Sequence, residues 1–197
     1  NVAVYSSNYI LYGDLSARIM SILKESLPGI EVYSIDEAFL DMRGIPLKEL
    51  QPLGLELCRK IFKYTGIPVS IGISHTKTLA KIASKLCKKY PKLNGCCLMQ
   101  REEDIEKVLG KFDIGDVWGI GRRHLKFLQT YGIKSALDFA RMSPYIVRKE
   151  FTITGLKTWK ELRGEPCITF EEQRTERAQI CVSRSFATEL TTFEELH

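Results

Sequence analysis

The stretch Glu-Val-Tyr-Ser-Ile-Asp-Glu-Ala-Phe-Leu-Asp-Met, residues 31–42, decides how the rest of the chain can be arranged. The alternating side chains before the two adjacent acids and the apolar run after them predict two short strands that meet at a tight bend. Asp36 and Glu37 lie at that bend. Neighbouring carboxylates repel each other, and Mg²⁺ binds through one or two carboxylates together with substrate phosphates. The bend therefore predicts half of a magnesium site, with a solvated turn as the alternative.

The composition is that of a globular protein with one large domain or two small ones. The chain has 197 residues, of which 44% are hydrophobic and 27% charged. It contains no apolar run of membrane-spanning length and no basic leader, and its six cysteines form no Cys-x-x-Cys pair, so we expect a cytoplasmic protein with free thiols. Because the chain lacks a starting Met and begins within an expected strand, we also expect it to be a piece of a longer protein.

The positive charge is concentrated in the middle of the chain. Residues 75–134 hold 13 Lys and Arg against 6 Asp and Glu, an excess of 7, whereas the parts before and after each have a net charge of −1. An excess confined to a third of the chain is typical of a protein whose partner carries phosphates.

Strands and helices alternate through residues 1–111. The acidic hairpin makes at least one strand pair antiparallel, so we predict an α+β fold with a mixed or antiparallel sheet and helices on one face. Further strands are expected at 2–5, 68–73 and 96–99, and helices within 15–23, 46–65, 76–90 and 102–109.

From residue 112 the strand signals stop, and residues 112–170 predict a small all-helical domain. Residues 171–197 predict a charged linker that leads into a strand at 179–186. The helices of the second domain are expected near 113–117, 122–131, 135–142, 145–150 and 154–162.

A second candidate site lies in Ser-His-Thr-Lys-Thr-Leu-Ala-Lys, residues 74–81, directly after an expected strand. A helix that starts there presents unsatisfied backbone N–H groups, and Lys77 in its first turn adds a charge for a phosphate. A lysine near a helix start is more often simply solvated. The phosphate site therefore requires Lys77 to lie beside the acidic bend in the folded protein.

A third candidate is Val-Trp-Gly-Ile-Gly-Arg-Arg, residues 117–123. A Gly-Ile-Gly turn between two short helices lets the backbone approach a phosphate closely, which is the pattern of a helix-hairpin-helix that grips nucleic acid without reading its sequence. An ordinary turn in a helical bundle is the alternative. The residues expected to contact DNA are Gly119, Gly121, Arg122, Arg123 and Lys126.

Taken together, the motifs at 33–41, 72–85 and 117–123 closely resemble those of the Y-family, translesion DNA polymerases. Within that family, residues 5–14 and 183–186 are similar to the branch that supplies the catalytic subunit of bacterial DNA polymerase V. The resemblance implies a protein that extends a primer past damaged template by Mg²⁺-dependent nucleotidyl transfer, in DNA repair and the SOS response.

The resemblance also implies a role for each part of the chain. Residues 1–111 would be the later part of the palm, 112–170 the thumb with its helix-hairpin-helix, and 171–197 the linker and first strand of the little finger. Asp36 and Glu37 would hold the catalytic Mg²⁺ ions in a two-metal site, and Lys77 would bind the triphosphate of the incoming dNTP. Primer-template DNA would be the substrate; further expected partners are a UmuD-like subunit, a recombinase filament and a sliding clamp.

One departure from the family pattern bears on activity. The family's first metal-binding Asp and its fingers precede the matched region, so we predict that this chain alone is inactive. Two other readings stay open. A non-catalytic, sequence-independent DNA-binding module would keep only the grip on the backbone, and another palm enzyme, such as a nucleotide cyclase, would keep the paired carboxylates without the Gly-Ile-Gly turn.

Overall fold

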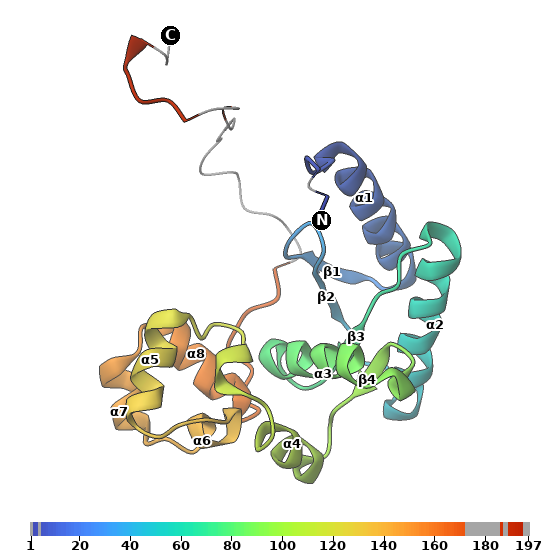
Figure 1. Ribbon diagram of the computed structural model, residues 1–197. Helices are drawn as coiled ribbons and strands as arrows, with labels where there is room; N and C mark the ends of the chain where they lie inside the picture. Colours follow the sequence, from blue (N-terminus) through green and yellow to red (C-terminus); the bar gives the residue numbers. More distant parts are fainter. Residues whose placement is uncertain (1, 4, 172–185, 187–188, 195–197) are drawn as a thin grey trace.

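The computed structural model describes residues 2–3, 5–171, 186 and 189–194, and it has an α/β part followed by a helical part (Figure 1). The first part contains α1 (Tyr9–Ser26), β1 (Gly29–Val32), β2 (Ala38–Asp41), α2 (Leu47–Thr65), β3 (Ile71–Ile73), α3 (Lys77–Lys89), the 3₁₀ turn η1 (Pro91–Leu93), β4 (Cys96–Leu98) and α4 (Glu102–Leu109). The second contains the 3₁₀ turn η2 (Ile114–Asp116), α5 (Arg122–Thr130), α6 (Ala136–Ala140), α7 (Pro144–Glu150) and α8 (Ile153–Leu162).

Local signals set the ends of the main helices. The Asn8 side chain accepts a hydrogen bond from the N–H of Leu11 and caps α1, and Thr76 caps α3 through the N–H of Leu79. At the end of α2, Gly66 has φ +71°, a left-handed conformation that glycine adopts without strain. The α+β class is therefore confirmed, and so are the predicted helices except the one at 113–117; α1 begins six residues before its predicted range.

The strands form two separate two-stranded sheets, so the prediction of one mixed sheet is wrong for the part of the chain that is described. β1 and β2 form the predicted antiparallel hairpin, in which Glu31 is opposite Phe39, while β3 and β4 pair in parallel. The strand expected at residues 2–5 is also wrong for the three of these residues that are described, because Val2 and Tyr5 are almost fully exposed and have no partner strand.

Helices cover both faces of the β3–β4 sheet, so the expectation of helices on one face is wrong as well. Ile73 and Cys96 pack against Leu50 of α2 on one face. On the other face, a Cβ at Gly72 would lie 2.0 Å from the carbonyl oxygen of Ala80 in α3, so only glycine allows this contact. The reason is that α3 connects two parallel strands, and such a pair is buried on both sides.

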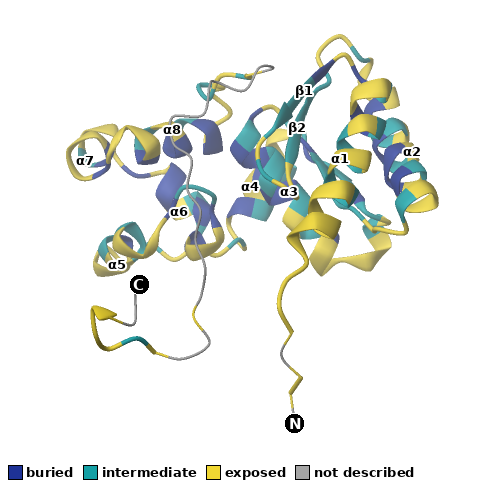
Figure 2. Cartoon of the chain, turned by 90° about the horizontal axis from the view of Figure 1, so that it is seen from above, coloured by how far each residue is buried: buried dark blue, intermediate teal, exposed yellow. Residues whose placement is uncertain are grey.

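The largest hydrophobic core joins the helical part to α3 and α4. It includes Leu79 and Leu109 of the first part together with Leu128 and Phe139 of the second. Figure 2 shows the buried surfaces of α6 and α8 turned towards α3 and α4, with exposed residues on the outside. The position of the helical part is thus fixed by apolar packing against α3.

The end of the chain and the absence of a membrane-spanning segment can be compared with the structure only for the residues that it describes. The strand predicted at 179–186 lies outside the described residues except for Phe186, which is in no strand. Within the described residues, no helix combines the length and the apolar character needed to cross a membrane.

Candidate functional site

The acidic pair lies in the loop between β1 and β2. The loop is closed by the backbone N–H groups of Tyr33 and Ser34, which both donate to the carbonyl oxygen of Glu37 over 3.0 Å. Asp36 and Glu37 are exposed, and Asp36 Oδ1 accepts a hydrogen bond from Ser34 Oγ at 2.6 Å. The bend therefore presents two carboxylates to solvent on a short, hydrogen-bonded turn.

One face of α3 lies against this hairpin. Lys77 and Lys81 are four residues apart and so project from the same face of the helix. The ammonium of Lys77 donates to Glu31 Oε2 on β1, and Lys81 Nζ lies 2.7 Å from Glu37 Oε1. The structure thus places the start of α3 beside the acidic bend, which is the arrangement that the phosphate site requires.

The glycine-containing turn meets the same place through Trp118. Its indole N–H donates to Tyr33 Oη over 3.3 Å, and the two rings are perpendicular with centroids 5.5 Å apart. Lys81 Nζ lies 5.0 Å from the ring centroids of both Tyr33 and Trp118. All three sequence motifs therefore converge around Lys81.

The two glycines of the turn have different environments. Gly119 has φ +90°, and a Cβ there would lie 2.4 Å from Thr158 Oγ1 of α8, so the close packing at this position requires glycine. Gly121 precedes α5 and is exposed, with nothing within 4 Å of a Cβ. The expected first helix, residues 113–117, is only the 3₁₀ turn η2.

The basic residues after the turn are accessible. Arg122, Arg123 and Lys126 are exposed, and their side chains make no ion pair or hydrogen bond with another residue in the described part of the chain. Unpaired cations beside a helix N-terminus form a surface that suits a phosphate backbone. His124 is different, because its ring packs 4.9 Å from that of Phe151.

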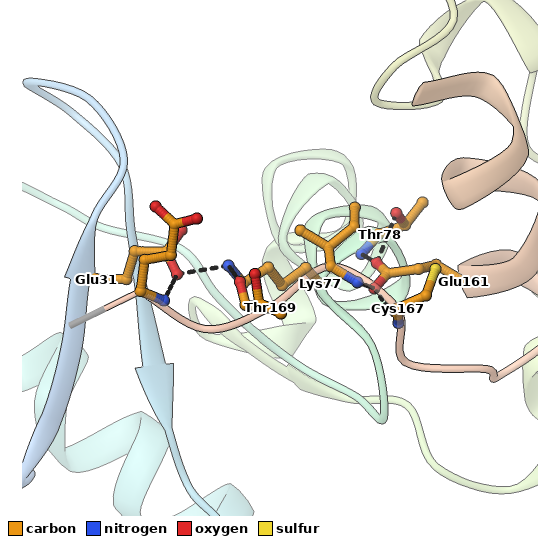
Figure 3. Close-up of polar contacts among 8 residues, drawn as sticks. Glu31, Lys77, Thr78, Glu161, Cys167 and Thr169 are labelled. Atoms are coloured by element: carbon orange, nitrogen blue, oxygen red, sulfur yellow. Dashed lines mark hydrogen bonds and ion pairs between the residues drawn. The ribbon is translucent and has the colours of Figure 1, made fainter. Parts of the chain in front are cut away.

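Sequence reasoning missed three residues of this region. Glu31 and Lys81 looked like ordinary strand and helix residues, although the four-residue spacing of Lys77 and Lys81 is a signal that could have paired them. Glu161 of α8 is 1% exposed, and its carboxylate accepts hydrogen bonds from both the N–H and the hydroxyl of Thr78 in α3 (Figure 3). No local pattern marks such a contact between distant elements.

The donor set at the bend fits part of a magnesium site. Asp36 and Glu37 supply the hard oxygens that Mg²⁺ prefers, but no third His, Cys, Asp or Glu joins them in a group among the described residues. An open groove of about 1400 Å³ borders the bend and is lined by β2, β3 and the start of α3. A metal here would therefore need further ligands from outside these residues.

The five described cysteines are free thiols. Those at 58, 87, 96, 97 and 167 are free, and burial raises the pKa of Cys87 and of Cys96 to about 12. Both thiols are therefore uncharged at neutral pH and are poor nucleophiles and metal ligands.

Comparison with known proteins gives consistent matches along the chain. Residues 1–85 match the model of the impB/mucB/samB family. Protein UmuC of Salmonella typhimurium is 41% identical over 197 residues, a match that covers 99% of this chain and 47% of that protein. The chain spans about half the length of the curated relatives it matches.

Solved structures agree with this assignment. The crystal structure of DinB from Sulfolobus solfataricus matches with a TM-score of 0.71 and 26% identity, over 86% of this chain and 50% of that one. An insertion ternary complex of Dbh DNA polymerase matches with a TM-score of 0.69 and 27% identity, over 83% and 47%.

Proposed function

This chain belongs to the impB/mucB/samB family of Y-family polymerase domains, and from that premise we propose that it is part of a longer translesion DNA polymerase, called here the parent protein. The parent protein would extend a primer past damaged template, in DNA repair and the SOS response, in the cytoplasm. The observation that carries this proposal is the convergence of the acidic bend, the start of α3 and the glycine-containing turn around Lys81.

In this proposal Asp36 and Glu37 hold Mg²⁺ together with ligands from elsewhere in the parent protein. Bound Mg²⁺ would lower the pKa of the primer 3′-hydroxyl and neutralise charge on the leaving pyrophosphate. Lys77 binds the triphosphate of the incoming dNTP, and Lys81 orients Glu37 through their ion pair. Trp118 keeps the glycine-containing turn against the hairpin, so that the DNA grip and the carboxylates keep a fixed spacing.

The helical part would supply the grip on primer-template DNA, as a helix-hairpin-helix whose first limb is a single 3₁₀ turn. The N-terminus of α5 and the exposed Arg122, Arg123 and Lys126 would contact phosphates. Residues 1–111 would then be the late palm, 112–170 the thumb, and 171–197 the linker and first strand of the little finger. A UmuD-like subunit, a recombinase filament and a sliding clamp stay predicted partners of the parent protein.

Primer extension tests the proposed chemistry. The chain alone should be inactive, because two carboxylates position Mg²⁺ poorly. In the parent protein, Asp36→Ala should lower the extension rate by about 10²-fold or more, the order expected when electrostatic stabilisation of the transition state is lost. Asp14→Ala removes an exposed acid from α1 and is the matched control. Extension that survives Asp36→Ala would contradict the assignment.

A non-catalytic DNA-binding module is the second candidate, and the exposed cations of α5 favour it for the isolated chain. The affinity for primer-template DNA should fall steeply as the salt concentration rises. Arg122→Ala and Arg123→Ala should each reduce the slope of log K against log salt concentration by about 1, and each should weaken binding to all DNA sequences alike. Arg18→Ala, which removes a cation paired with Asp14 on α1, is the control. A loss that depends strongly on DNA sequence would rule out a backbone grip, and salt-insensitive binding would favour a cyclase-like enzyme.

A further inference from the structure

Glu31 and Lys77 together hold a third segment of the chain. Lys77 Nζ donates to Glu31 Oε2 and, over 2.7 Å, to the carbonyl oxygen of Thr169. The same Glu31 oxygen accepts a hydrogen bond from the N–H of Glu171 over 2.8 Å. Only 10% of the Lys77 side chain and 15% of the Glu31 side chain are exposed, so this is a largely buried, charge-assisted contact.

The segment that they hold, residues 167–171, is called here the exit segment because it leaves the helical part after α8. Its beginning is fixed separately by Glu161, whose Oε1 accepts hydrogen bonds from the N–H groups of Cys167 and Ile168 over 3.3 and 3.1 Å. Figure 3 shows the two anchor points on opposite sides of the Lys77 side chain. A change at Glu31 or Lys77 can therefore release residues 169–171 while Glu161 still holds 167 and 168.

Lys77 has little capacity left for another ligand in this arrangement. An ammonium has three N–H donors, and two of them are used by Glu31 and Thr169. The rings of Phe39 and Phe170 lie 4.8 and 5.6 Å from Nζ and restrict its approach from other directions. A phosphate on Lys77 would also face the Glu31 carboxylate, and two anions in contact repel each other.

We propose that Glu31 and Lys77 form a binding site for the exit segment, and that a polyphosphate on Lys77 releases residues 169–171 from it. This inference rests on the proposed function, because that function makes Lys77 the triphosphate ligand. In the parent protein, nucleotide binding would thereby loosen the connection between the helical part and whatever follows residue 171. Glu31 is then a positioning residue, because it acts on the nucleotide only through Lys77.

Thermodynamic linkage gives the proposal a sign that can be tested. If the exit segment and the phosphate exclude each other, each lowers the apparent affinity of the other by the same factor, so a change that weakens the hold on the segment must tighten phosphate binding. Glu31→Gln removes the negative charge that competes with phosphate and weakens the hold on Glu171. It should therefore tighten polyphosphate binding, whereas a residue that merely supports the fold would weaken binding or leave it unchanged when replaced.

Hydrogen exchange on the full 197-residue chain, with inorganic tripolyphosphate as the probe, measures both sides of the linkage. Saturating tripolyphosphate should speed exchange of the Glu171 amide about tenfold and leave the amides of Cys167 and Ile168 unchanged as internal controls. Glu31→Gln should speed Glu171 exchange without ligand and lower the Kd for tripolyphosphate about tenfold. Glu49→Gln, which changes an exposed acid on α2, should do neither.

The Lys77→Ala variant separates failure of the inference from failure of the proposed function. If it weakens tripolyphosphate binding, but the ligand leaves Glu171 exchange unchanged in the unaltered chain, the release is wrong while the phosphate role of Lys77 stands. If tripolyphosphate does not bind, or binds equally to Lys77→Ala, then the phosphate role of Lys77 is wrong, and so is the release that depends on it. Tighter binding by Glu31→Gln together with faster Glu171 exchange supports both.

Discussion

The helical part and the β1–β2 hairpin are stabilised in different ways. In the helical part, Leu128, Phe139 and Val147 are completely buried in one apolar core that extends into α3 and α4. The hairpin has only Gly29 fully buried and borders an open groove of about 1400 Å³. It packs Ile30, Ala38 and Leu40 against a smaller apolar cluster of α1 and α2, and it is also held by polar and aromatic contacts with α3 and Trp118. A rigid core thus carries the proposed DNA grip, while the proposed metal ligands lie on the less densely packed part.

The largest expected change in stability comes from removing a large side chain from each part. Phe139→Ala should lower the free energy of unfolding by about 4 kcal/mol, because a buried ring leaves a cavity that closes poorly. Leu40→Ala, at a half-buried position of β2 beside the groove, should cost about 1 kcal/mol, because less area is lost and the site can relax. Urea denaturation measures both. Equal losses would show that the two parts are packed alike.

The buried contact between the parts should rank next. Glu161→Gln replaces an acceptor-only carboxylate by an amide whose NH₂ group must face a donor, either at Thr78 or at Cys167 and Ile168. We expect a loss of about 3 kcal/mol, because a buried charge-assisted hydrogen bond is broken and a donor is left unsatisfied. Glu165→Gln, at an exposed position just after α8, should change stability by less than about 0.5 kcal/mol. Similar losses for the two variants would show that Glu161 does not stabilise the contact between the helical part and α3.

The two glycines of the turn sharpen the comparison within the helical part. Gly119→Ala should cost about 2 kcal/mol, since φ +90° strains any other residue and the new Cβ would overlap Thr158. Gly121→Ala should stay within about 0.5 kcal/mol, because the position is open, and should affect DNA binding more than stability. Thermal unfolding and salt-dependent DNA binding separate the two effects. A larger loss of stability for Gly121→Ala than for Gly119→Ala would contradict this difference between the two glycines.

The smallest effect concerns one carboxylate in each part. The hydrogen bonds from Ser135 hold the pKa of Asp138 below its usual value, in a capping box at the start of α6. A lowered pKa in the folded state gives stability that is present above the unfolded pKa, about 3.9, and is lost as pH falls through the lower folded pKa. Asp138→Asn should therefore lower stability at pH 7, and this loss should shrink as the pH falls through the folded pKa.

Asp41 at the end of β2 gives the matched measurement in the hairpin. A hydrogen bond from the Arg43 side chain lowers the pKa of the Asp41 carboxyl, but Arg43 is largely exposed. Asp41→Asn should therefore have the same sign of pH dependence and a smaller amplitude, about 0.5 kcal/mol or less. Urea denaturation between pH 2 and 7 checks both variants. A loss of stability that is constant across this range would exclude the carboxylates as its source.

Local signals in the sequence predicted the elements but not how the strands are arranged. Caps at Asn8 and Thr76 and the left-handed Gly66 define helix ends, and the acids at 36 and 37 define the hairpin. The division into two sheets depends on which strand edges meet, and this is decided by packing of α2 and α3 on both faces of β3–β4. Periodicity within one strand cannot report such contacts between distant segments.

The same limit applies to the site. Asp36 and Glu37 were identifiable because adjacent carboxylates between strand-forming residues repel each other, and Lys77 because a cation in the first turn of a helix suits a phosphate; the structure brings them to one place, and their roles stay predictions. Glu31 and Glu161 were missed, because their partners are 46 and 83 residues away in the sequence. An acidic residue in a strand or a helix has no local feature that indicates a distant lysine or helix N-terminus.

The position of Trp118 allows intrinsic tryptophan fluorescence to report on the acidic bend. The chain has two tryptophans, and Trp159 is buried in the helical core, where its emission should be insensitive to ligands at the bend. Trp118 instead contacts both Tyr33 and the ammonium of Lys81, a setting in which fluorescence quenching varies with small displacements. With Trp159 replaced by Phe, the emission of a single indole would follow in real time how the glycine-containing turn moves against the acidic hairpin.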